Sequence, residues 1–553
     1  MTTFAVWAPG RRRVDLLLGA SDRLPMDRAE KGWWRLDVPD AQSGTRYLFS
    51  LDGGPGRPDP RSAWQPDGID GPSALVDHGS FRWDDAKWHG LELCTAVIYE
   101  LHVGTFSREG TFAAAVEHLP HLVDLGVNAV EVMPVSEGSG SRGWGYDGVD
   151  LSAPHHSYGG PDAFKRFVDA CHRRGIAVVL DVVYNHLGPA GNYLGEYGPY
   201  FTDRYNTPWG WAVNFDGEGS YGTRDFVISN ACMWFVDYRV DGLRLDAVHA
   251  IFDEGAFHIL EELAVTVDRL SRELDRELWL IAESDRNDPR IVRSREQHGY
   301  GLDACWDDDF HHALHAVLTG ETTGYYVDFG CVGQLAKAFR DGYVFDGQFS
   351  EFRQRYHGRP AGDLPGSSFV CCLQDHDQVG NRAFGERMAA LVGPDLLKVG
   401  AALVLLAPFV PMVFQGEEWG ASTPFLYFTD HQEPELARAV REGRQREFPL
   451  TGGAEVPDPQ ALETFLRSKL DWSELHQEPH RALLEWHRKL IALRRREPDL
   501  RGLDRKLVST AFDENDRWLV VRRGRFSIAV NLADDPRAVP IECVGSIELA
   551  SAA

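Results

Sequence analysis

Apolar strand-like runs alternate with amphipathic helical segments from residue 94 onward, and this alternation most constrains the fold. The runs CTAVIYELHV (94–103), VNAVEVMPV (127–135) and IAVVLDVVYNH (176–186) are nearly continuous in apolar residues, as strands buried on both faces are. Strands that each lead into a helix form a parallel sheet. Seven clear strands and a weaker one near GLDACWDD (301–308) predict an α/β fold, a (β/α)8 TIM barrel, with its active site at the carboxyl ends of the strands.

Shorter strands with period-2 alternation flank this region on both sides. FAVWAP, RVDLLLG and GWWRLDVP are separated by Pro, Gly and Asp, a pattern typical of a β-sandwich. LVSTAFDENDRWLVV returns to strand alternation, but the tail SIELASAA ends early for a closed sandwich. We therefore expect an immunoglobulin-like N-terminal β-sandwich with its linker (1–90), the catalytic barrel (91–490) and a small, truncated C-terminal β-domain (491–553).

Composition narrows the range of partners. Lys and Arg number 57 against 83 Asp and Glu, which gives a net charge of −26. A strongly negative surface repels phosphate backbones and anionic lipids, so we expect no nucleic-acid or membrane partner. Neutral polymers such as glucans remain possible substrates. The start has no signal-peptide pattern, and the eight cysteines show no zinc spacing, which fits free thiols in a reducing cytosol. These features predict a cytoplasmic protein.

Three carboxylates each follow a predicted buried strand. They are Asp246 in VDGLRLDAVH, Glu283 in LWLIAESD and Asp377 in FVCCLQDHDQVGNR. An acid, a nucleophile and a helper around one bond are what glycoside hydrolysis needs. The alternative is that each caps a following helix, which suits any one of them better than all three together. The set indicates an enzyme that cleaves or rearranges sugars.

The surroundings of these carboxylates suggest separate roles. Arg244 stands two residues before Asp246 on a strand, so both side chains face the same way, and a guanidinium keeps a neighbouring carboxylate ionised, as a nucleophile requires. Glu283 ends an apolar strand, where desolvation raises a carboxyl pKa and favours a proton donor. Asp377, next to His376, is left to bind sugar hydroxyls and favour ring distortion.

The end of the third strand carries further polar residues in DVVYNH (181–186). His186 can bond a sugar hydroxyl, and for Asp181 we favour a structural hydrogen-bond role. A calcium site at Asp181 and Asn185 is the alternative, although no EF-hand-like loop is present.

Two other segments combine polar and aromatic residues. WGYDGVDLSAPHHSYGGP (144–161) offers Tyr146 in a tight turn, and sugar faces stack on aromatic rings, with core packing as the alternative. WDDDFHHALHAV (306–317) joins three acids to two histidines. It fits no zinc signature, so a hydroxyl-binding platform is the preferred interpretation.

Four of these segments resemble the four signature regions of the α-amylase superfamily. Within it, the chain is most similar to the maltooligosyltrehalose trehalohydrolase family, whose pattern runs through 144–165, 306–315 and 424–444. The resemblance implies retaining hydrolysis of the α-1,4 bond next to the terminal trehalose of maltooligosyltrehalose. It also implies the three-domain architecture, no cofactor and no required metal. The four signature segments are DVVYNH (181–186), GLRLDAVH (242–249), IAES (281–284) and LQDHD (373–377).

The resemblance also implies roles for single residues. Asp246 matches the nucleophile, Glu283 the general acid/base and Asp377 the transition-state stabiliser. A second group matches the subsite that holds the cleaved glucose ring, and a third is expected to bind trehalose on the leaving side. The ring-binding group is Arg244, His186, His376 and Tyr146, and the trehalose-side group is Asp309, His312, Gln378 and Arg382.

One position departs from the family pattern. Asp375 stands where the family has Asn before His-Asp. We expect this added carboxylate either to raise the pKa of a neighbour by like-charge repulsion or to be neutralised by Arg382.

Two other functions share some of these features. A glucan branching or debranching enzyme would keep the barrel and the three carboxylates but differ in its acceptor. A catalytically silent glucan-binding protein would lack a catalytic carboxylate, and all three are present. The favoured reading implies a pathway partner, a maltooligosyltrehalose synthase that makes the terminal linkage.

Overall fold

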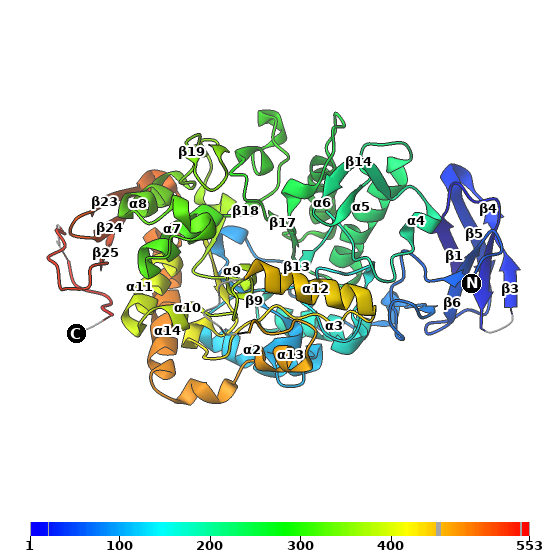
Figure 1. The fold of residues 1–553 in the computed structure, drawn as a ribbon, viewed down its shortest axis with the longest axis horizontal. Coiled ribbons are helices and arrows are strands. Elements are labelled where there is room, and N and C mark those ends of the chain that lie inside the picture. Colours follow the sequence, from blue (N-terminus) through cyan, green and yellow to red (C-terminus); the bar gives the residue numbers. More distant parts are fainter. Residues whose placement is uncertain (1, 20–21, 449–454, 542–544, 552–553) are drawn as a thin grey trace.

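The molecule is elongated, with a β-rich region at each end and a barrel between them (Figure 1). A computed structural model describes residues 2–19, 22–448, 455–541 and 545–551. The N-terminal strands (blue) and the C-terminal strands (red) lie at opposite ends of the longest axis. The central part, which carries the predicted site, therefore touches both end regions.

Eight parallel strands close into a barrel in which β22 pairs with β9. This confirms the predicted TIM barrel, and the weak strand near residue 305 is the short β18. Each strand is buried along its whole length, which explains its nearly continuous apolar sequence. In order around the barrel they are β9 (Ile98–Leu101), β10 (Ala129–Val132), β13 (Ala177–Val182), β16 (Gly242–Leu245), β17 (Trp279–Ala282), β18 (Ala304–Trp306), β21 (Phe369–Cys372) and β22 (Val410–Phe414).

Side-chain alternation along the strands gives the barrel an apolar floor and a polar mouth. Ala129 and Val179 belong to the apolar cluster inside the barrel. Two residues later on the same strands stand Glu131 and Asp181, and successive odd positions of a strand point to the same face. The acidic residues therefore face inward, toward the carboxyl ends of the strands.

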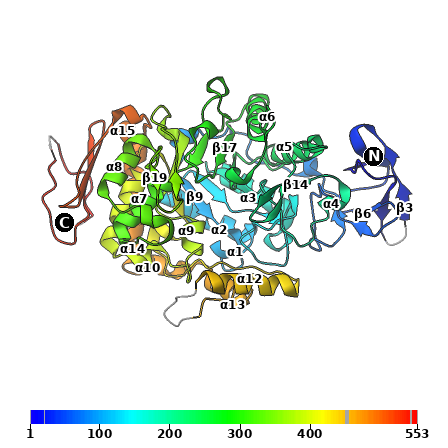
Figure 2. The ribbon, with the colours of Figure 1, turned by 45° about the horizontal axis from the view of Figure 1, so that its top comes forward.

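Long helices alternate with the strands and lie around the barrel (Figure 2). Thr111 starts the first of them by accepting a hydrogen bond from Ala114 N at 3.2 Å, and Gly126 ends it with a left-handed φ of 97°. A Thr N-cap and a C-terminal Gly are common at helix ends. The long helices are α2 (Phe112–Leu125), α3 (Gly160–His172), α5 (Ser220–Asp237), α6 (Ile259–Leu274), α7 (Asp308–Thr319), α8 (Val332–Asp341), α11 (Pro394–Leu405), α12 (Pro434–Glu447) and α14 (His480–Arg496).

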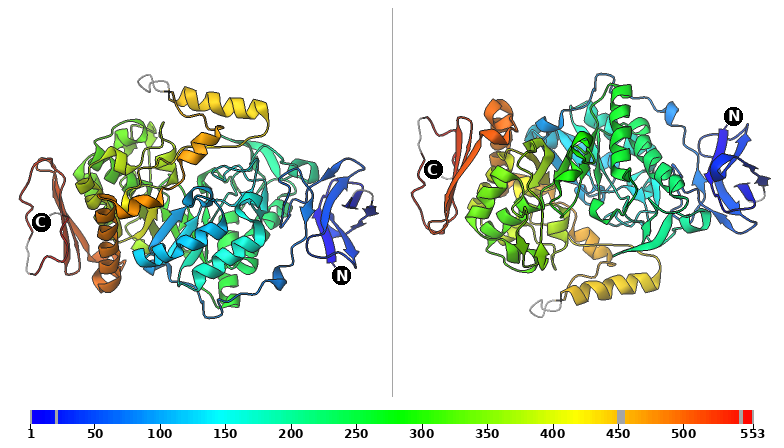
Figure 3. Two further views of the ribbon diagram at one scale, coloured as in Figure 1. Left: turned by 90° about the horizontal axis from the view of Figure 1, so that it is seen from below. Right: turned by 90° about the horizontal axis from the view of Figure 1, so that it is seen from above.

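The sequence did not predict three two-stranded ribbons, two of which follow the barrel strands β10 and β13, while the third follows helix α8. They pair β11 with β12, β14 with β15 and β19 with β20. Helix α12 (gold) lies at the side of the barrel, together with α13 (Figure 3). Their bounds, with those of the short helices, are β11 (Ser136–Glu137), β12 (Asp150–Pro154), β14 (Phe201–Thr207), β15 (Gly210–Val213), β19 (Phe349–Ser350), β20 (Arg355–Tyr356), α1 (Val103–Phe106), α4 (Leu194–Tyr197), α9 (His376–Gly380), α10 (Met388–Leu391), α13 (Leu462–Arg467) and α15 (Pro498–Arg501).

The N-terminal region forms two antiparallel sheets, as its alternation predicts. It docks on the barrel through Trp7, which is 1% exposed and packs edge-on against Tyr200 with ring centroids 5.1 Å apart. Arg57 adds an ion pair to Glu196 of α4 at 2.8 Å. One sheet contains β1 (Thr2–Trp7), β5 (Trp33–Val38) and β4 (Asp27–Arg28), and the other β3 (Asp22–Pro25), β2 (Val14–Leu18), β6 (Arg46–Leu51), β7 (Gly56–Arg57) and β8 (Ser73–Ala74).

The C-terminal region is a three-stranded antiparallel sheet of β23 (Val508–Asp513), β24 (Trp518–Arg523) and β25 (Phe526–Asn531). Leu519 and Val521 of β24 join the same buried cluster as Phe339 of α8. The sheet is thus anchored to the barrel helices. The predicted domain boundaries at 90 and 490 stay predictions.

Within the described ranges, no helix combines the length and the apolar character that crossing a membrane demands.

Candidate active site

Asp246 and Glu283 meet at one buried guanidinium, that of Arg244. Arg244 Nη1 donates to Asp246 Oδ1 at 2.8 Å, and Nη2 lies 3.4 Å from Glu283 Oε2. Asp246 follows β16 and Glu283 follows β17, which are neighbours in the barrel. The structure therefore brings the predicted nucleophile and acid/base together, as parallel strand ends require.

Asp246 is surrounded by donors. Besides Arg244, the side chain of Asn185 donates from Nδ2 to Asp246 Oδ2 at 2.7 Å. Both carboxylate oxygens thus accept a hydrogen bond, and donors of this kind stabilise the charged form. The side-chain oxygen of Asn185, which a calcium ion would need, lies 2.5 Å from His186 Nδ1, and this contact does not favour the alternative calcium site.

Glu283 lies in a different environment. Burial raises its pKa to about 8, the charge of Arg244 opposes this shift, and the charges of Asp246 and Asp377 support it. Its Oε2 accepts from the backbone N of Ala247 at 2.5 Å. Ala247 has a φ of 40°, in the left-handed region, so a strained backbone residue presents the donor. At neutral pH Glu283 carries a proton that it can donate.

Asp377 is the most open of the three carboxylates. Its side chain is 44% exposed, and Oδ1 lies 3.5 Å from His376 Nε2. Asn381 Nδ2 donates to the same oxygen at 3.3 Å. An accessible carboxylate beside a positive ring is suited to accept hydrogen bonds from sugar hydroxyls.

His376 is held as a cation by Glu100. Burial alone would lower its pKa, but the negative charges of Glu100 and Asp377 outweigh burial and raise the pKa to about 10. Its Nδ1 bonds Glu100 Oε1, and its backbone N donates to Glu100 Oε2 at 3.1 Å. The protonated ring therefore donates through Nε2 toward the mouth of the barrel.

Tyr146 links this histidine to the arginine. Its hydroxyl lies 2.8 Å from His376 Nε2 and donates to Asp181 Oδ2 at 2.6 Å. Asp181 in turn accepts from Arg244 Nη1 at 2.8 Å. Burial raises the pKa of Asp181 to about 6, while the charge of Arg244 opposes the shift. These contacts agree with the structural role expected for Asp181.

His186 lies beside Asp246 but has protein partners on both ring nitrogens. Nε2 is 2.8 Å from the carbonyl oxygen of Tyr146, and Nδ1 is 2.5 Å from Asn185 Oδ1. Its ring stacks on Trp209 with centroids 4.1 Å apart and planes within 3°. A sugar hydroxyl would have to share or replace one of these bonds.

Asp375, the departure from the family pattern, is the N-cap of α9. Its Oδ1 accepts from Asp377 N at 2.9 Å and from Gln378 N at 3.2 Å. Burial, and then the charge of Glu100, raise its pKa to about 7. Arg382 instead pairs with Glu321 at 2.9 Å, so the structure gives no support to neutralisation of Asp375 by Arg382.

Comparison with known proteins agrees with this geometry. Residues 79–218 match the model of the alpha amylase catalytic domain, and residues 1–64 match carbohydrate-binding module 48, the isoamylase N-terminal domain. The malto-oligosyltrehalose trehalohydrolase of Arthrobacter ramosus is 52% identical over 97% of this chain and 94% of its own length. The chain belongs to the malto-oligosyltrehalose trehalohydrolase family.

One further relative carries the same family name, and a solved structure shares the fold. The malto-oligosyltrehalose trehalohydrolase of Rhizobium sp. is 49% identical over 96% of this chain and 91% of its own. A crystal structure from Salmonella typhimurium, described as an alpha amylase, superimposes with a TM-score of 0.89 at 42% identity, covering 96% of this chain and 91% of that one. The likeness extends over the barrel and both end regions.

The four residues expected to bind trehalose differ in their positions relative to Asp377. Gln378 and Arg382 lie in and after α9, next to Asp377. His312 is 5% exposed and its ring packs on Tyr325 at 4.5 Å between centroids. Asp309 is 2% exposed, so its carboxylate faces the protein interior.

The partners of Asp309 point to a structural task. Its Oδ2 accepts from Asn287 Nδ2 at 2.7 Å and from the backbone N of Phe345 at 2.7 Å. Sugar binding by Asp309 stays a prediction that these contacts do not favour. Burial raises the pKa of Asp309 to about 6 and raises that of the preceding Asp308 well above its ordinary value, with the charges of Glu283 and Asp375 as the next causes for Asp308.

Sequence reasoning missed two acidic residues inside the barrel. Glu100 binds His376, and Glu131, its register partner on the neighbouring strand, is 1% exposed with no hydrogen-bond partner for its carboxyl oxygens in the described part of the chain. Burial and the charge of Glu100 raise the pKa of Glu131 well above its ordinary value. An isolated Glu in the apolar runs VIYELHV and AVEVMPV was the signal that could have found them.

Proposed function

We propose that the protein hydrolyses the α-1,4-glucosidic bond next to the terminal trehalose of maltooligosyltrehalose, and releases trehalose with retention at the cleaved anomeric carbon. One observation carries the chemistry. A single guanidinium, Arg244, contacts two carboxyl groups in different surroundings: Asp246, which accepts hydrogen bonds on both oxygens, and Glu283, whose pKa burial raises to about 8. Family membership supplies the substrate class.

In the first step Glu283 gives its proton to the glycosidic oxygen as the bond from that oxygen to the anomeric carbon breaks. Asp246 attacks the same carbon and forms a glycosyl ester, so the glucan stays on the enzyme and trehalose leaves with the proton. Arg244 holds Asp246 in position for this attack through the hydrogen bond from Nη1 to Oδ1.

In the second step the ionised Glu283 removes a proton from water. The water oxygen attacks the anomeric carbon, the ester bond to Asp246 breaks, and Glu283 is again protonated. Two displacements at one carbon restore its configuration. The product on this side is the shortened glucan with a reducing end.

We assign Asp377 to stabilising the oxocarbenium-like transition state through the sugar hydroxyls. The chain of contacts His376–Tyr146–Asp181–Arg244 is proposed to form the subsite for the cleaved glucose ring, with His186 beside Asp246. The protonated His376 supplies a charged donor there, and charged donors make the stronger hydrogen bonds.

On the trehalose side we propose Gln378, which follows the accessible Asp377 in α9, and Arg382, which lies just after α9, as binding residues. His312 stays a candidate for this side. Asp308 supports the acid/base better than Asp309 does, because it acts electrostatically on Glu283.

The reaction is tested by following maltopentaosyltrehalose in the presence of the enzyme by proton NMR. The proposal expects the non-reducing trehalose signal and a new reducing-end signal that appears first as the α anomer. A new reducing end that appears first as the β anomer would contradict retention, and the absence of trehalose would contradict the substrate.

A glucan branching or debranching activity is the alternative, because it uses the same barrel and carboxylates. It would show new α-1,6 signals, or loss of existing ones, when the enzyme acts on amylose or glycogen. The trehalohydrolase proposal expects neither.

We also propose that the enzyme works in the cytoplasm, in sequence with a maltooligosyltrehalose synthase that makes its substrate. The seven cysteines in the described part of the chain are free thiols, which suits a reducing compartment. Metabolite analysis of a strain lacking this protein should show maltooligosyltrehalose accumulating.

A further inference from the structure

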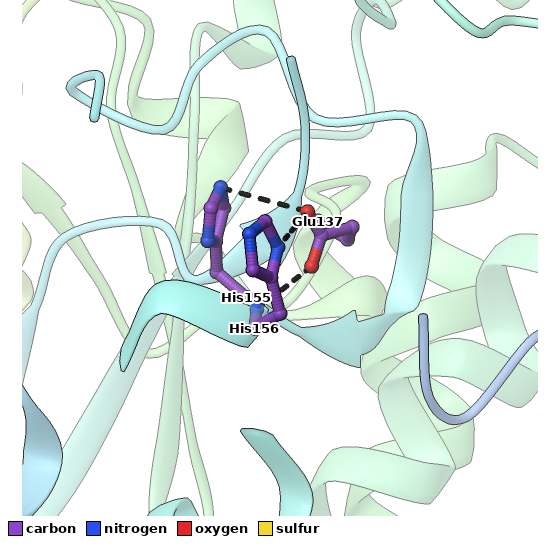
Figure 4. A group of neighbouring side chains, drawn as sticks. All are labelled: Glu137, His155 and His156. Atoms are coloured by element: carbon purple, nitrogen blue, oxygen red, sulfur yellow. Dashed lines mark hydrogen bonds and ion pairs between the residues drawn. The ribbon is translucent and has the colours of Figure 1, made fainter. Parts of the chain in front are cut away.

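A carboxylate and two histidines converge on the ribbon that follows strand β10. Glu137 ends β11, and His155 and His156 follow β12 (Figure 4). Glu137 is 0% exposed and His155 is 9% exposed. The cluster lies outside the three-carboxylate site, and the proposed reaction gives it no role.

The ligand atoms have the spacing of a small metal site. His156 Nδ1 lies 2.8 Å from Glu137 Oε1, and His155 Nε2 lies 3.6 Å from the same oxygen. All three atoms are within 4.8 Å of one another. Ligands bound to tetrahedral zinc at 2.0–2.1 Å stand about 3.3 Å apart, so the two measured distances bracket the required one. Figure 4 shows both rings directed at that oxygen.

The charge around the cluster favours a cation. Asp150 is paired with Glu137 in the ribbon register, and opposite residues of antiparallel strands share one face. Asp150 is 6% exposed, and its Oδ2 has no hydrogen-bond partner among the described residues. Among the described residues, the ion pairs of Glu137 are with His155 and His156, and no Lys or Arg pairs with this buried carboxylate.

The remaining contacts of the cluster show what binding would change. Glu137 Oε2 accepts from His156 N at 2.8 Å, and His156 Nε2 lies 3.3 Å from Ser157 Oγ. Both side chains are therefore held by a hydrogen bond at the atom that would not bind the metal, as metal ligands usually are. Ser157 N donates to His155 Nδ1 at 3.2 Å. Metal binding through His155 Nε2 moves the ring proton to Nδ1 and gives up this long hydrogen bond. At His156 the metal replaces the proton of Nδ1, so the 2.8 Å hydrogen bond between Nδ1 and Glu137 Oε1 is given up as well.

We propose that Glu137, His155 and His156 form a binding site for a divalent transition-metal ion of the zinc class, with water as the fourth ligand. Two imidazoles and one carboxylate suit zinc, cobalt or nickel better than calcium or magnesium, which take oxygen ligands. The ion would link the end of β11 to the residues that follow β12. The loop between these strands carries Tyr146, so the site stabilises the loop without taking part in the reaction.

The test is a titration of chelator-stripped full-length protein with Zn²⁺ by calorimetry and with Co²⁺ by visible absorption. The proposal expects one ion per chain, a Kd of about 10 μM or tighter, and the absorption of four-coordinate cobalt. Binding of the wild-type protein only near millimolar Zn²⁺, or octahedral cobalt alone, overturns it.

Substitutions in the cluster test whether the ion binds at these three residues. Glu137→Gln preserves size, His156→Ala changes a half-exposed ring, and His89→Ala is the control at an exposed histidine. Each cluster variant should weaken Zn²⁺ binding by about 100-fold or more, in the range by which ligand and supporting changes affect metal sites, and His89→Ala should leave it unchanged. Wild-type affinity in His156→Ala overturns the site even where Glu137→Gln fails to fold.

Discussion

Arg244 holds two carboxyl groups whose surroundings give them different chemistry. Asp246 accepts from Arg244 and Asn185, whereas Glu283 accepts from one backbone amide and is otherwise desolvated. A strand end in an apolar barrel thus supplies either a charged or a neutral carboxyl group, according to the donors around it.

Glu283 should set the alkaline limit of activity. It acts as an acid, so it must be protonated, and its pKa of about 8 predicts that kcat/KM falls as pH rises through roughly this value. Glu283→Gln should lower kcat by about 10²–10⁴ and remove that limb of the pH profile. Glu277→Gln, at an exposed position two residues before the same strand, is the control and should behave like wild type. An unchanged alkaline limb in Glu283→Gln would reject the assignment.

Asp375 should make stability depend on pH. Its folded pKa of about 7 lies above the ordinary 3.8, so the stability it contributes is complete below about pH 4 and is lost as pH rises through 7. Asp375→Asn keeps the N-cap oxygen and removes the charge. It should be more stable than wild type at pH 8 by a few kcal/mol at most, given about 1.4 kcal/mol per pKa unit, with the gain vanishing near pH 4.

Urea unfolding at both pH values measures this difference. Asp504→Asn is the matched control, because Asp504 is also an N-cap but is exposed, and its effect should not depend on pH. A pH-independent effect of Asp375→Asn would contradict the buried-charge account.

The places of the three carboxylates proposed as catalytic could be predicted from the sequence because each ends an apolar run. Arg244 and Asp246 share a face by their spacing, and the structure joins them as expected. Asp309 was harder, since three consecutive acids at a helix start differ only in direction, and the backbone turns Asp309 inward to Phe345 N. Glu137, His155 and His156 come together only through a ribbon whose register no local motif specifies.

At the scale of elements, Asp309 fastens two loops to the start of α7. Its Oδ2 binds Asn287, after β17, and Phe345, after α8. Apolar periodicity predicted the eight strands and most long helices. The hydrogen bonds of Asp309 and the three ribbons depend on contacts between distant segments, which periodicity does not encode.

Asp309→Ala should therefore lower the free energy of unfolding by about 1–3 kcal/mol, because it leaves two buried donors without an acceptor. Asp309→Asn should cost less and leave KM near the wild-type value. Asp516→Ala, at an exposed turn, is the control for stability. If Asp309→Asn raised KM tenfold with unchanged stability, Asp309 would instead bind sugar.

At the scale of the whole molecule, the N-terminal sheets are fixed to the barrel by a close contact. A Cβ at Gly222 of α5 would lie 2.1 Å from Trp7 Cζ2. Because Gly222 has no side chain, the ring of Trp7 can pack directly against the backbone of the helix. The sequence predicted both regions but not this contact, because a lone glycine in a helix has no pattern that names its partner.

Gly222→Ala should destabilise the protein by about 1–3 kcal/mol, as overpacking of a core does, although Ala is otherwise favoured in a helix. Gly195→Ala in α4, where nothing lies within 4 Å of the new Cβ, is the control and should be neutral or stabilising. Thermal unfolding of both variants measures the difference, and equal midpoints would contradict tight docking.

The central claim is that this enzyme recognises trehalose on the leaving side of the cleaved bond. The most direct measurement is a competition in one tube between equal amounts of maltopentaosyltrehalose and maltoheptaose, with products followed by chromatography. The account predicts release of free trehalose at least about 100-fold faster than any shortening of maltoheptaose, a ratio that differential binding can reach. Equal shortening of both substrates, or branched products without trehalose, would contradict it.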